Sequence, residues 1–194
     1  MTILSNFEED MTYEVLISTK NEDASLNIKP VGLKIRDNSF VFKLFPNKTL
    51  SNIKNTGELT VYLLQDVLIF TKALTCNLSR EDILSEVNYE ILCEISNLDT
   101  TSVEDNYGEN ITATIIAKPV KIIEHKKTLP IINRASNQII ELLVDFSRYD
   151  FMDVDAKSNF IKKLKNSELL IRKTGNKKHL DSLNILKKEL KNKE

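Results

Sequence analysis

The chain has 194 residues, of which 41% are hydrophobic and 28% charged, with a net charge of −1. This composition is typical of a folded domain and excludes global disorder, and the four glycines and four prolines argue against low-complexity segments. The charge is uneven, because residues 157–194 hold 12 Lys and Arg against 4 Asp and Glu, so this segment carries +8 and the remainder −9.

No targeting or membrane-spanning segment is visible in the sequence. The N-terminus lacks a basic patch followed by an apolar run, and the most apolar stretch, residues 59–74, is interrupted by Gln65, Asp66 and Lys72. We therefore expect a cytoplasmic protein with no membrane contact. Its two cysteines, Cys76 and Cys93, lie outside any CxxC pattern and its two histidines are far apart, so no metal site is expected.

Short apolar segments rich in β-branched and aromatic residues open the chain. They predict strands at residues 13–19, 28–35 and 40–45, separated by polar turn clusters at 21–25 and 37–39. Strands so closely spaced predict an antiparallel meander that closes into a barrel.

The hydrophobic period then changes. Residues 49–57 predict a short helix, with Thr49 as its N-cap and Gly57 just past its end. Beyond it the pattern predicts strands at 59–64 and 67–70, a short helix capped by Ser79, and two long strands at 89–98 and 111–123 joined by the acidic loop 99–110.

After Pro130 the pattern is helical to the end of the chain. It predicts one helix with apolar residues from Ile131 to Phe146, a second over about 155–171, and a third carrying Leu180 to Leu190. The fold class predicted is therefore α+β and mainly β, with an antiparallel barrel domain at 1–128 and a helical C-terminal extension at 129–194. Strands and helices do not alternate, which argues against a Rossmann fold.

No catalytic motif stands out. GxSxG, P-loop, GxGxxG and HExxH patterns are all absent from the sequence. Acidic pairs such as Glu8-Glu9 and Glu81-Asp82 are more simply explained as solvated or capping groups. Catalytic residues therefore stay unassigned.

The most informative position is the start of the helix at residue 49. Lys48 and Thr49 directly follow a predicted strand, where the first N–H groups of the helix are unpaired and lie at the positive end of its dipole. A phosphate placed there would gain these donors together with the lysine and the hydroxyl. On spacing alone, a plain N-cap at Thr49 beside a solvated Lys48 explains the pattern equally well.

The same segment carries a resemblance to a known family. Flavin-reductase-like FMN-binding split barrels read K-x-T, N-I, T-G-E-F and V-N in this region. The chain is similar to them, but it lacks the residue between lysine and threonine and has Leu59 and Tyr62 in place of phenylalanine and asparagine. The matching residues are Lys48-Thr49, Asn52-Ile53, Thr56-Gly57-Glu58-Leu59 and Val61-Tyr62.

The whole chain more closely resembles an archaeal family of FMN-binding split-barrel proteins that is described as a domain of unknown function. The resemblance extends over nearly the full length. Its motifs stand here as Ser18-Thr19-Lys20-Asn21-Glu22-Asp23-Ala24, Asn27-Ile28-Lys29-Pro30-Val31-Gly32, Asn133-Arg134-Ala135 and Lys173-Thr174-Gly175. Ala24 stands where the family has glycine, so we expect the first turn to avoid a positive φ there and to be longer.

The resemblance implies FMN as cofactor, a flavin-binding role for the barrel domain and a homodimer with the flavin near the subunit boundary. Pro30 lacks an N–H and Gly32 lacks a side chain, so the backbone of that strand is expected to face the flavin ring, although an edge strand with a bulge explains both residues as well. For Arg134 a structural ion pair competes with phosphate binding. The cofactor-binding residues predicted are Ile28, Lys29, Pro30, Val31, Gly32, Phe45, Asn47, Lys48, Thr49, Asn52 and Arg134.

The function predicted is FMN binding, with flavin reductase or other oxidoreductase activity on an unassigned substrate. One alternative is a module that holds flavin or binds a partner without catalysis. Another is a nucleic-acid binder that uses the basic C-terminal helices. This last alternative is disfavoured because no aromatic residues interleave with the lysines to stack on bases.

Overall fold

The structure is a computed structural model that describes residue 7 and residues 12–105, 108–126 and 134–193. The chain divides into two compact units. The barrel unit comprises the described residues of 1–65 and 77–128, and the helical unit comprises those of 66–76 and 129–194. The chain therefore passes between the two units three times.

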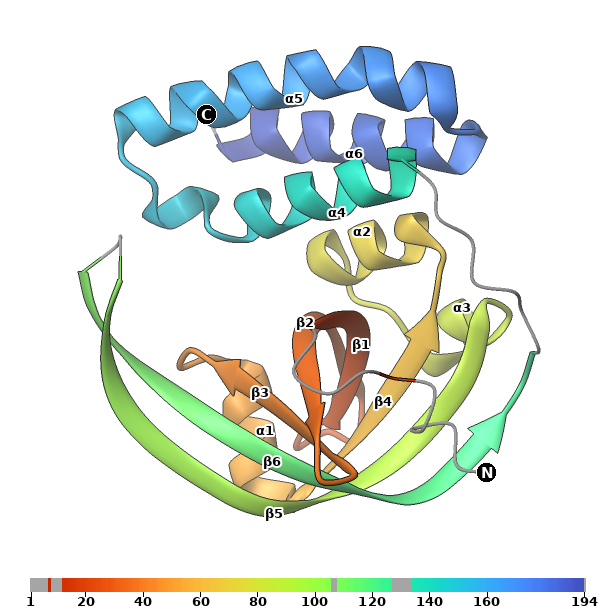
Figure 1. Cartoon of the computed structure of the whole chain (residues 1–194), viewed down its shortest axis with the longest axis vertical. Helices are drawn as coiled ribbons and strands as arrows, with labels where there is room; N and C mark the ends of the chain where they lie inside the picture. Colours follow the sequence, from red (N-terminus) through yellow and green to blue (C-terminus); the bar gives the residue numbers. More distant parts are fainter. Residues whose placement is uncertain (1–6, 8–11, 106–107, 127–133, 194) are drawn as a thin grey trace. The chain divides into compact units, whose positions relative to one another are not determined.

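The barrel unit is built from six antiparallel strands that close into a barrel in the order β1-β2-β3-β6-β5-β4 (Figure 1). This arrangement confirms the predicted barrel. Its elements are β1 (Tyr13–Lys20), β2 (Leu26–Arg36), β3 (Ser39–Leu44), α1 (Lys48–Thr56), β4 (Glu58–Leu64), α3 (Arg80–Leu84), β5 (Val87–Asp105) and β6 (Gly108–Glu124).

The barrel core is filled by alternate residues of the strands. On β1, for example, Val15 and Ile17 are at most 1% exposed. Helix α1 adds Leu50 and Ile53, which are three positions apart and lie on one helical face as the sequence predicted. Full burial of such side chains contributes about 1.5–3 kcal/mol each, so α1 is anchored to the barrel by its apolar face.

The β5–β6 hairpin is much longer than the sequence indicated. The two strands stay paired as far as Asp105 and Gly108, where residues 99–110 were expected to form a loop (Figure 1). That expectation was wrong because β-branched Thr100, Thr101 and Val103 favour strand more than the nearby acidic residues oppose it. Beyond Glu94, β5 pairs with β6 alone within the described residues.

The first turn also differs from expectation. Ala24 has φ +66°, so the turn keeps its left-handed residue although glycine is absent. The Ala24 N–H donates to the carbonyl of Asn21 at 3.0 Å, and the Asn21 N–H donates to the carbonyl of Ser25 at 2.9 Å. These bonds compensate for the strain of a side chain in this region of backbone space.

The helical unit contains α2 at residues 67–75, where the predicted strand at residues 67–70 was wrong. It forms a helix because Asp66 caps it by accepting the Leu68 N–H at 2.9 Å, and a short apolar run carries no period that distinguishes strand from buried helix. The elements of this unit are α2 (Val67–Thr75), α4 (Arg134–Ser147), the 3-10 turn η2 (Tyr149–Phe151), α5 (Val154–Thr174) and α6 (Lys177–Lys193).

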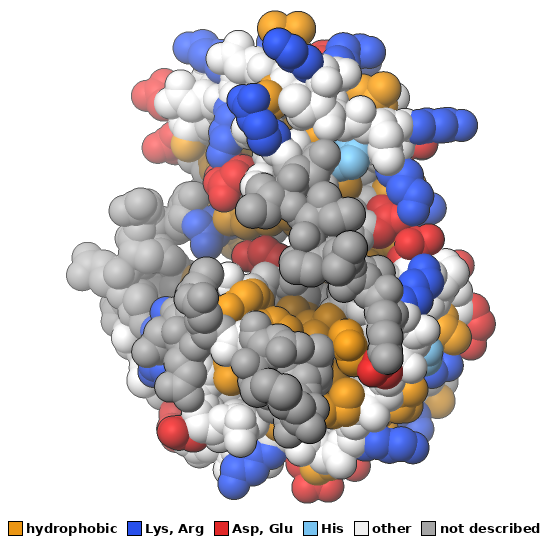
Figure 2. All heavy atoms as spheres, turned by 45° about the vertical axis from the view of Figure 1, so that its right-hand side comes forward, with side chains coloured by type: hydrophobic (Ala, Val, Ile, Leu, Met, Phe, Trp, Pro, Cys, Tyr) orange, Lys and Arg blue, Asp and Glu red, His pale blue; other side chains and the backbone are white. Residues whose placement is uncertain are grey.

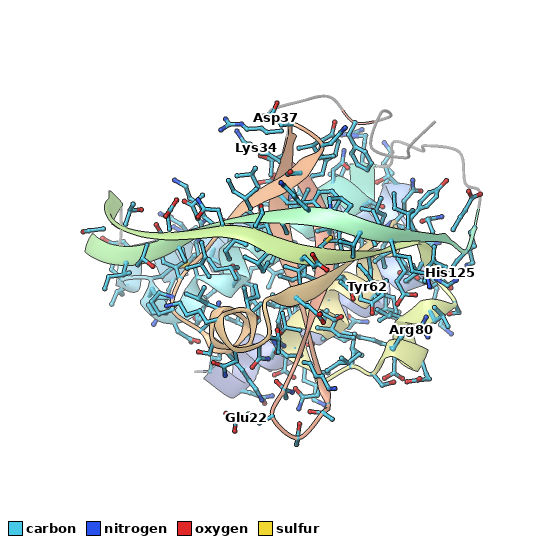
Figure 3. The ribbon with its side chains drawn as sticks, turned by 90° about the horizontal axis from the view of Figure 1, so that it is seen from below. Glu22, Lys34, Asp37, Tyr62, Arg80 and His125 are labelled. Atoms are coloured by element: carbon cyan, nitrogen blue, oxygen red, sulfur yellow. The ribbon has the colours of Figure 1, made fainter. Side chains whose placement is uncertain are left out.

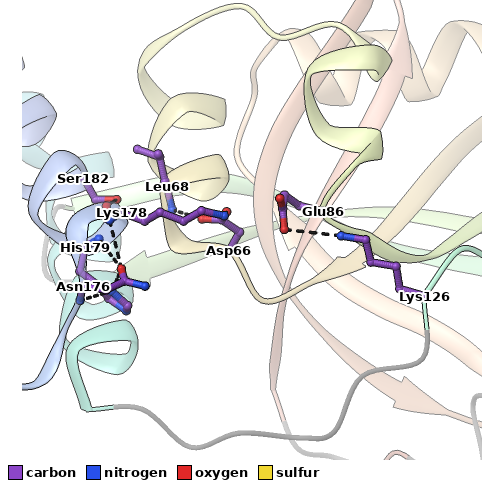
Figure 4. A network of polar contacts seen from close by, with 8 residues as sticks. All are labelled: Asp66, Leu68, Glu86, Lys126, Asn176, Lys178, His179 and Ser182. Carbon is purple, nitrogen blue, oxygen red and sulfur yellow. Dashed lines mark hydrogen bonds and ion pairs between the residues drawn. The ribbon is translucent and has the colours of Figure 1, made fainter.

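These helices bury the apolar faces predicted for the C-terminal part of the chain. Ile139 and Leu142 of α4 and Leu186 of α6 are fully buried. Helix α2 packs beside α4 and α6, although it ends at residue 75 and these helices begin only at residues 134 and 177 (Figure 1). An ion pair between Asp66 and Lys178 joins the start of α2 to α6 (Figure 4). None of the described helices is long and apolar enough to cross a membrane.

Candidate functional site

The start of α1 is arranged differently from the prediction. The N-cap is Asn47, whose Oδ1 accepts the Leu50 N–H at 2.9 Å, and not Thr49, which lies inside the first turn. The asparagine competes successfully because it precedes the threonine and has extended backbone geometry suited to a cap. Gly57 ends the helix in the left-handed conformation, as predicted.

The first turn of α1 offers positive potential to an anion. The backbone N–H groups of Lys48 and Thr49 have no partner within the helix, since the first turn of any α-helix leaves such groups unsatisfied. The side chain of Lys48 is exposed, and no acidic residue occupies this turn. The arrangement is suited to a phosphate or carboxylate.

Two other predicted site residues of α1 are buried and hold the helix in place. Thr49 Oγ1 accepts the side-chain amide of Asn27 at 2.8 Å. Asn52 uses its amide to donate to Thr19 Oγ1 at 3.1 Å and to Asn21 Oδ1 at 2.8 Å. These bonds tie the start of α1 to the first hairpin, so Thr49 and Asn52 position the helix.

The predicted strand segment lies where the barrel is split. Residues 26–33 of β2 pair with β1, whereas the described pairing of β2 with β3 begins only at Leu33. Residues 26–32, here called the split edge, therefore pair in the ladder on one side. Pro30 within this edge has no N–H to lose, which explains why proline is tolerated.

Side chains of the split edge differ in what they offer a ligand. Ile28 and Val31 are buried, so only their backbone is available, while Lys29 and Pro30 are half-buried. A Cβ at Gly32 would meet Thr12 Cγ2 at 3.1 Å and Glu14 Oε1 at 3.3 Å. The glycine is thus explained by close packing against residues of the barrel itself.

Phe45 directly follows β3, beyond the last pair of β3 with β2, which is Leu33 with Phe42. The start of α1 lies beside the split edge, because Asn27 of this edge donates to Thr49. Phe45 is 46% exposed, so part of its ring is accessible to a ligand. The structure therefore brings Phe45, Asn47, Lys48 and the split edge together, whereas Arg134 belongs to the helical unit and its ligand role stays a prediction.

A polar cluster around the buried Glu90 was not predicted from the sequence. Glu90 of β5 accepts two hydrogen bonds from the Arg80 guanidinium, at 2.9 and 2.6 Å, and its Oε2 lies 3.1 Å from His125 Nε2. Figure 3 shows Arg80, His125 and Tyr62 on the same side of the barrel. The Arg80 bonds, which outweigh desolvation, hold the pKa of Glu90 below its usual value. Nearby, Ser18 Oγ donates to the Tyr62 hydroxyl at 3.4 Å, and burial raises the pKa of Tyr62. Since Glu90 is engaged from two sides, this cluster ties α3 to the barrel.

In the helical unit, Ser136, His179 and Asn176 stand in the order of a nucleophile, a base and an orienting group. His179 Nε2 lies 3.0 Å from Ser136 Oγ and its Nδ1 lies 2.7 Å from Asn176 Oδ1. However, the Asn176 backbone N–H donates to Nδ1 at 3.1 Å, and Asn176 Oδ1 accepts the Lys178 N–H at 3.0 Å (Figure 4). Asn176 Oδ1 also accepts the His179 N–H at 3.4 Å, so Asn176 caps the start of α6 and the three side chains are explained as part of that cap.

The described residues contain no group of His, Cys, Asp and Glu side chains that could hold a metal ion. Cys93 is buried, and burial raises its pKa to about 12, so it is an unreactive packing residue. Cys76 is exposed. Within its described residues, the barrel unit therefore has a helix start suited to an anion, beside a strand edge with ladder pairs on one side and an exposed aromatic ring. This arrangement is suited to a planar ligand that carries a phosphate.

A closed antiparallel barrel followed by helices, with such a site at its split, defines a split-barrel protein. Residues 13–126 match the N-terminal domain, and residues 133–188 the following domain, of a family described as proteins of unknown function, DUF447. The chain belongs to this family, which confirms the family resemblance found in the sequence.

A solved structure agrees with this fold over nearly the whole chain. An FMN-bound protein of the same family from Methanosarcina mazei matches with a TM-score of 0.79 and 20% sequence identity, over 95% of this chain and 98% of that chain. The flavin reductase of a styrene monooxygenase from Pseudomonas putida covers 62% of this chain and 93% of its own, at 16% identity, with a TM-score of 0.43. This second match is too weak to carry an argument.

Proposed function

We propose that the protein binds FMN at the split of its barrel, with the phosphate at the start of α1 and the ring along the split edge. The observation that carries this proposal is that an exposed lysine and outward-pointing helix N–H groups lie next to a strand edge whose ladder pairs, among the described residues, are all on one side. The FMN-bound relative, which shares the fold over nearly its whole length, supports the choice of ligand.

The residues divide into two roles in this proposal. Lys48 and the first N–H groups of α1 bind the phosphate, and the Asn47 side chain keeps the helix start in shape. The backbone of residues 28–32 and the exposed ring of Phe45 line the flavin. Thr49 and Asn52 act indirectly, through their hydrogen bonds to the first hairpin.

FMN bound in this way would supply the redox chemistry, while the protein sets its position and excludes water. A flavin-dependent oxidoreductase and a module that holds flavin without catalysis would both use such a site. Loss of the flavin absorbance on anaerobic addition of NADH or NADPH would favour the oxidoreductase. We further propose that the protein is cytoplasmic. We also propose that it forms a homodimer, because a second subunit can cover a planar ring at the split of the barrel.

The nucleic-acid alternative has less support, because many basic side chains of the helical unit already have acidic partners. Lys163 pairs with Asp145, and both Lys187 and Arg172 pair with Glu168. Figure 2 shows Lys and Arg side chains spread over the helical unit together with acidic ones, without a single continuous basic surface on the face drawn. We propose that these helices serve packing.

A titration of two flavins tests the proposed phosphate site. Replacing Lys48 with alanine removes one charge-assisted contact, which is worth about 1.5–3 kcal/mol, and so is expected to weaken FMN binding roughly ten- to a hundredfold. Riboflavin has the same ring but no phosphate, and its affinity should not change. Binding would be measured by quenching of flavin fluorescence.

The matched control is Lys54→Ala, which removes the basic residue in the last turn of the same helix and is expected to leave both affinities unchanged. Equal FMN affinities for wild type and Lys48→Ala would place the phosphate elsewhere. Equal losses for FMN and riboflavin would mean that Lys48 supports the fold or the ring and not the phosphate.

A further inference from the structure

One hydroxyl in the barrel is buried without a partner. Within the described part of the chain, Thr112 Oγ1 is the buried side-chain polar atom for which no hydrogen-bond partner exists, and Thr112 as a whole is 4% exposed. Buried polar groups in native proteins are nearly always paired, because an unpaired one loses its hydration without compensation. The exception therefore requires an explanation.

Thr112 lies beside the proposed ligand site. Leu44, the last residue of β3, pairs with Ala113 of β6, so the next residues along the two strands are Phe45 and Thr112. On its other side Thr112 pairs with Thr101 of β5. Phe45 follows the end of β3, where pairing with β2 has already ended, so Thr112 lies beside the exposed ring of Phe45 at the split of the barrel.

The protein alone does not need this hydroxyl. A valine has nearly the same shape as threonine, and replacing a hydroxyl that lacks a partner by a methyl group removes a desolvation cost without breaking a bond. The Thr112 hydroxyl loses its hydration in the free protein without gaining a hydrogen bond. Since it lies next to the proposed binding site, it is suited to form a hydrogen bond with the ligand. A hydroxyl can both donate and accept, so it can meet a carbonyl oxygen or an N–H group.

We infer that Thr112 is a ligand-binding residue whose hydroxyl forms a hydrogen bond with the polar pyrimidine edge of the flavin ring. This inference rests on the proposed function and adds a hydrogen bond to the flavin ring and not to the phosphate. Phe45, next to it, packs against the ring. Thr112 therefore helps to select a flavin over a planar ligand that lacks hydrogen-bonding groups at this edge.

The test compares Thr112→Val, Thr112→Ser and Thr101→Val with the wild type. Thr112→Val is expected to weaken the binding of FMN and of riboflavin equally, by about threefold to tenfold, as for the loss of one hydrogen bond. It should also shift the absorbance maxima of the bound flavin. Thr112→Ser restores the hydroxyl and should bind within about twofold of wild type, and Thr101→Val, at the exposed cross-strand neighbour, should bind as wild type.

The unfolding midpoint in denaturant without flavin provides an independent measurement, and Thr112→Val should match or exceed the wild type there. A lower midpoint would show that the hydroxyl has a partner in the protein itself and would overturn the inference. Unchanged flavin affinities of Thr112→Val would also overturn it, while leaving the proposed function intact if the wild type binds. A wild type that binds neither flavin would defeat the proposed function and this inference with it.

Discussion

Ala24 has a backbone conformation that is unfavourable for a residue with a side chain. Its φ of +66° lies in the left-handed region, which costs a residue with a Cβ about 1–2 kcal/mol. Glycine removes that cost but gains freedom in the unfolded chain, worth about 0.4–1 kcal/mol in the opposite direction. The first effect is larger, so Ala24→Gly is expected to raise the free energy of unfolding by about 0.5–1 kcal/mol, as measured by denaturant titration.

The same substitution in a helix gives the opposite sign and serves as the control. Ala156 lies in the first turn of α5, where its N–H donates to Asp153 Oδ1 at 2.8 Å. Ala156→Gly is expected to lower the free energy of unfolding by up to about 1 kcal/mol. A loss of stability in Ala24→Gly would mean that the turn bonds of Asn21 and Ser25 depend on the alanine itself.

The roles of candidate-site residues were predictable where they depend on neighbours in the sequence, and not where they depend on residues far away in the chain. Lys48 and Gly57 follow from the pattern of a helix start and end, and both lie where the sequence indicated. The role of Thr49 was missed because its partner, Asn27, is 22 residues away in the chain. Thr112 was missed as well, since only the strand register brings it next to Phe45.

At the scale of elements, the link between α3 and β5 depends on an ion pair. The pKa of Glu90 is lowered mainly by the hydrogen bonds of Arg80, so this pair contributes stability above the pKa of Glu90 in the unfolded chain and loses it as pH falls through the folded pKa. Glu90→Gln is expected to cost about 1–2 kcal/mol at pH 7, because the partly exposed Arg80 recovers some hydration.

The pH dependence separates this effect from a general loss of packing. Below about pH 4.5 the wild type should lose stability more steeply than Glu90→Gln, so that the two unfolding curves converge in acid. The control Glu81→Gln changes an exposed carboxylate on α3, the helix that carries Arg80, and should leave the loss of stability below about pH 4.5 unchanged. A constant difference between wild type and Glu90→Gln from pH 3 to pH 7 would contradict the ion-pair explanation.

Most elements were predictable from the period of their apolar residues. The strands of the meander, the helix at α1 and the three C-terminal helices all appear where the sequence placed them, within a few residues. The exceptions have physical reasons. Helix α2 was read as a strand because its four apolar residues Val67, Leu68, Ile69 and Phe70 show no period, and packing against α4 and α6 decides their structure.

At the scale of the whole molecule, the helical unit draws on two separated parts of the chain. Residues 66–76 belong with the C-terminal helices, although they precede the boundary expected near residue 128. The C-terminal segment by itself would therefore lack α2, which buries Phe70 and Ala73 in that unit. A division of the protein into independent domains at residue 128 stays a proposal.

The proposed homodimer is tested by the mass of the particle in solution. A chain of 22.2 kDa should sediment as a particle of twice that mass, with and without FMN. The same measurement at several concentrations would give the dissociation constant of the dimer. A monomer that still binds FMN tightly would contradict the proposal that a second subunit covers the ring.

Binding of FMN is the central claim, and an equilibrium titration of the wild-type protein tests it most directly. The protein, stripped of any small molecules by partial unfolding and refolding, is titrated with FMN while flavin absorbance and fluorescence are followed. We expect saturable binding of one FMN per chain, with a shifted absorbance spectrum and weaker binding of riboflavin, because riboflavin lacks the phosphate that α1 is suited to hold. A refolded protein that leaves the spectrum and fluorescence of FMN unchanged at micromolar concentrations would contradict the account.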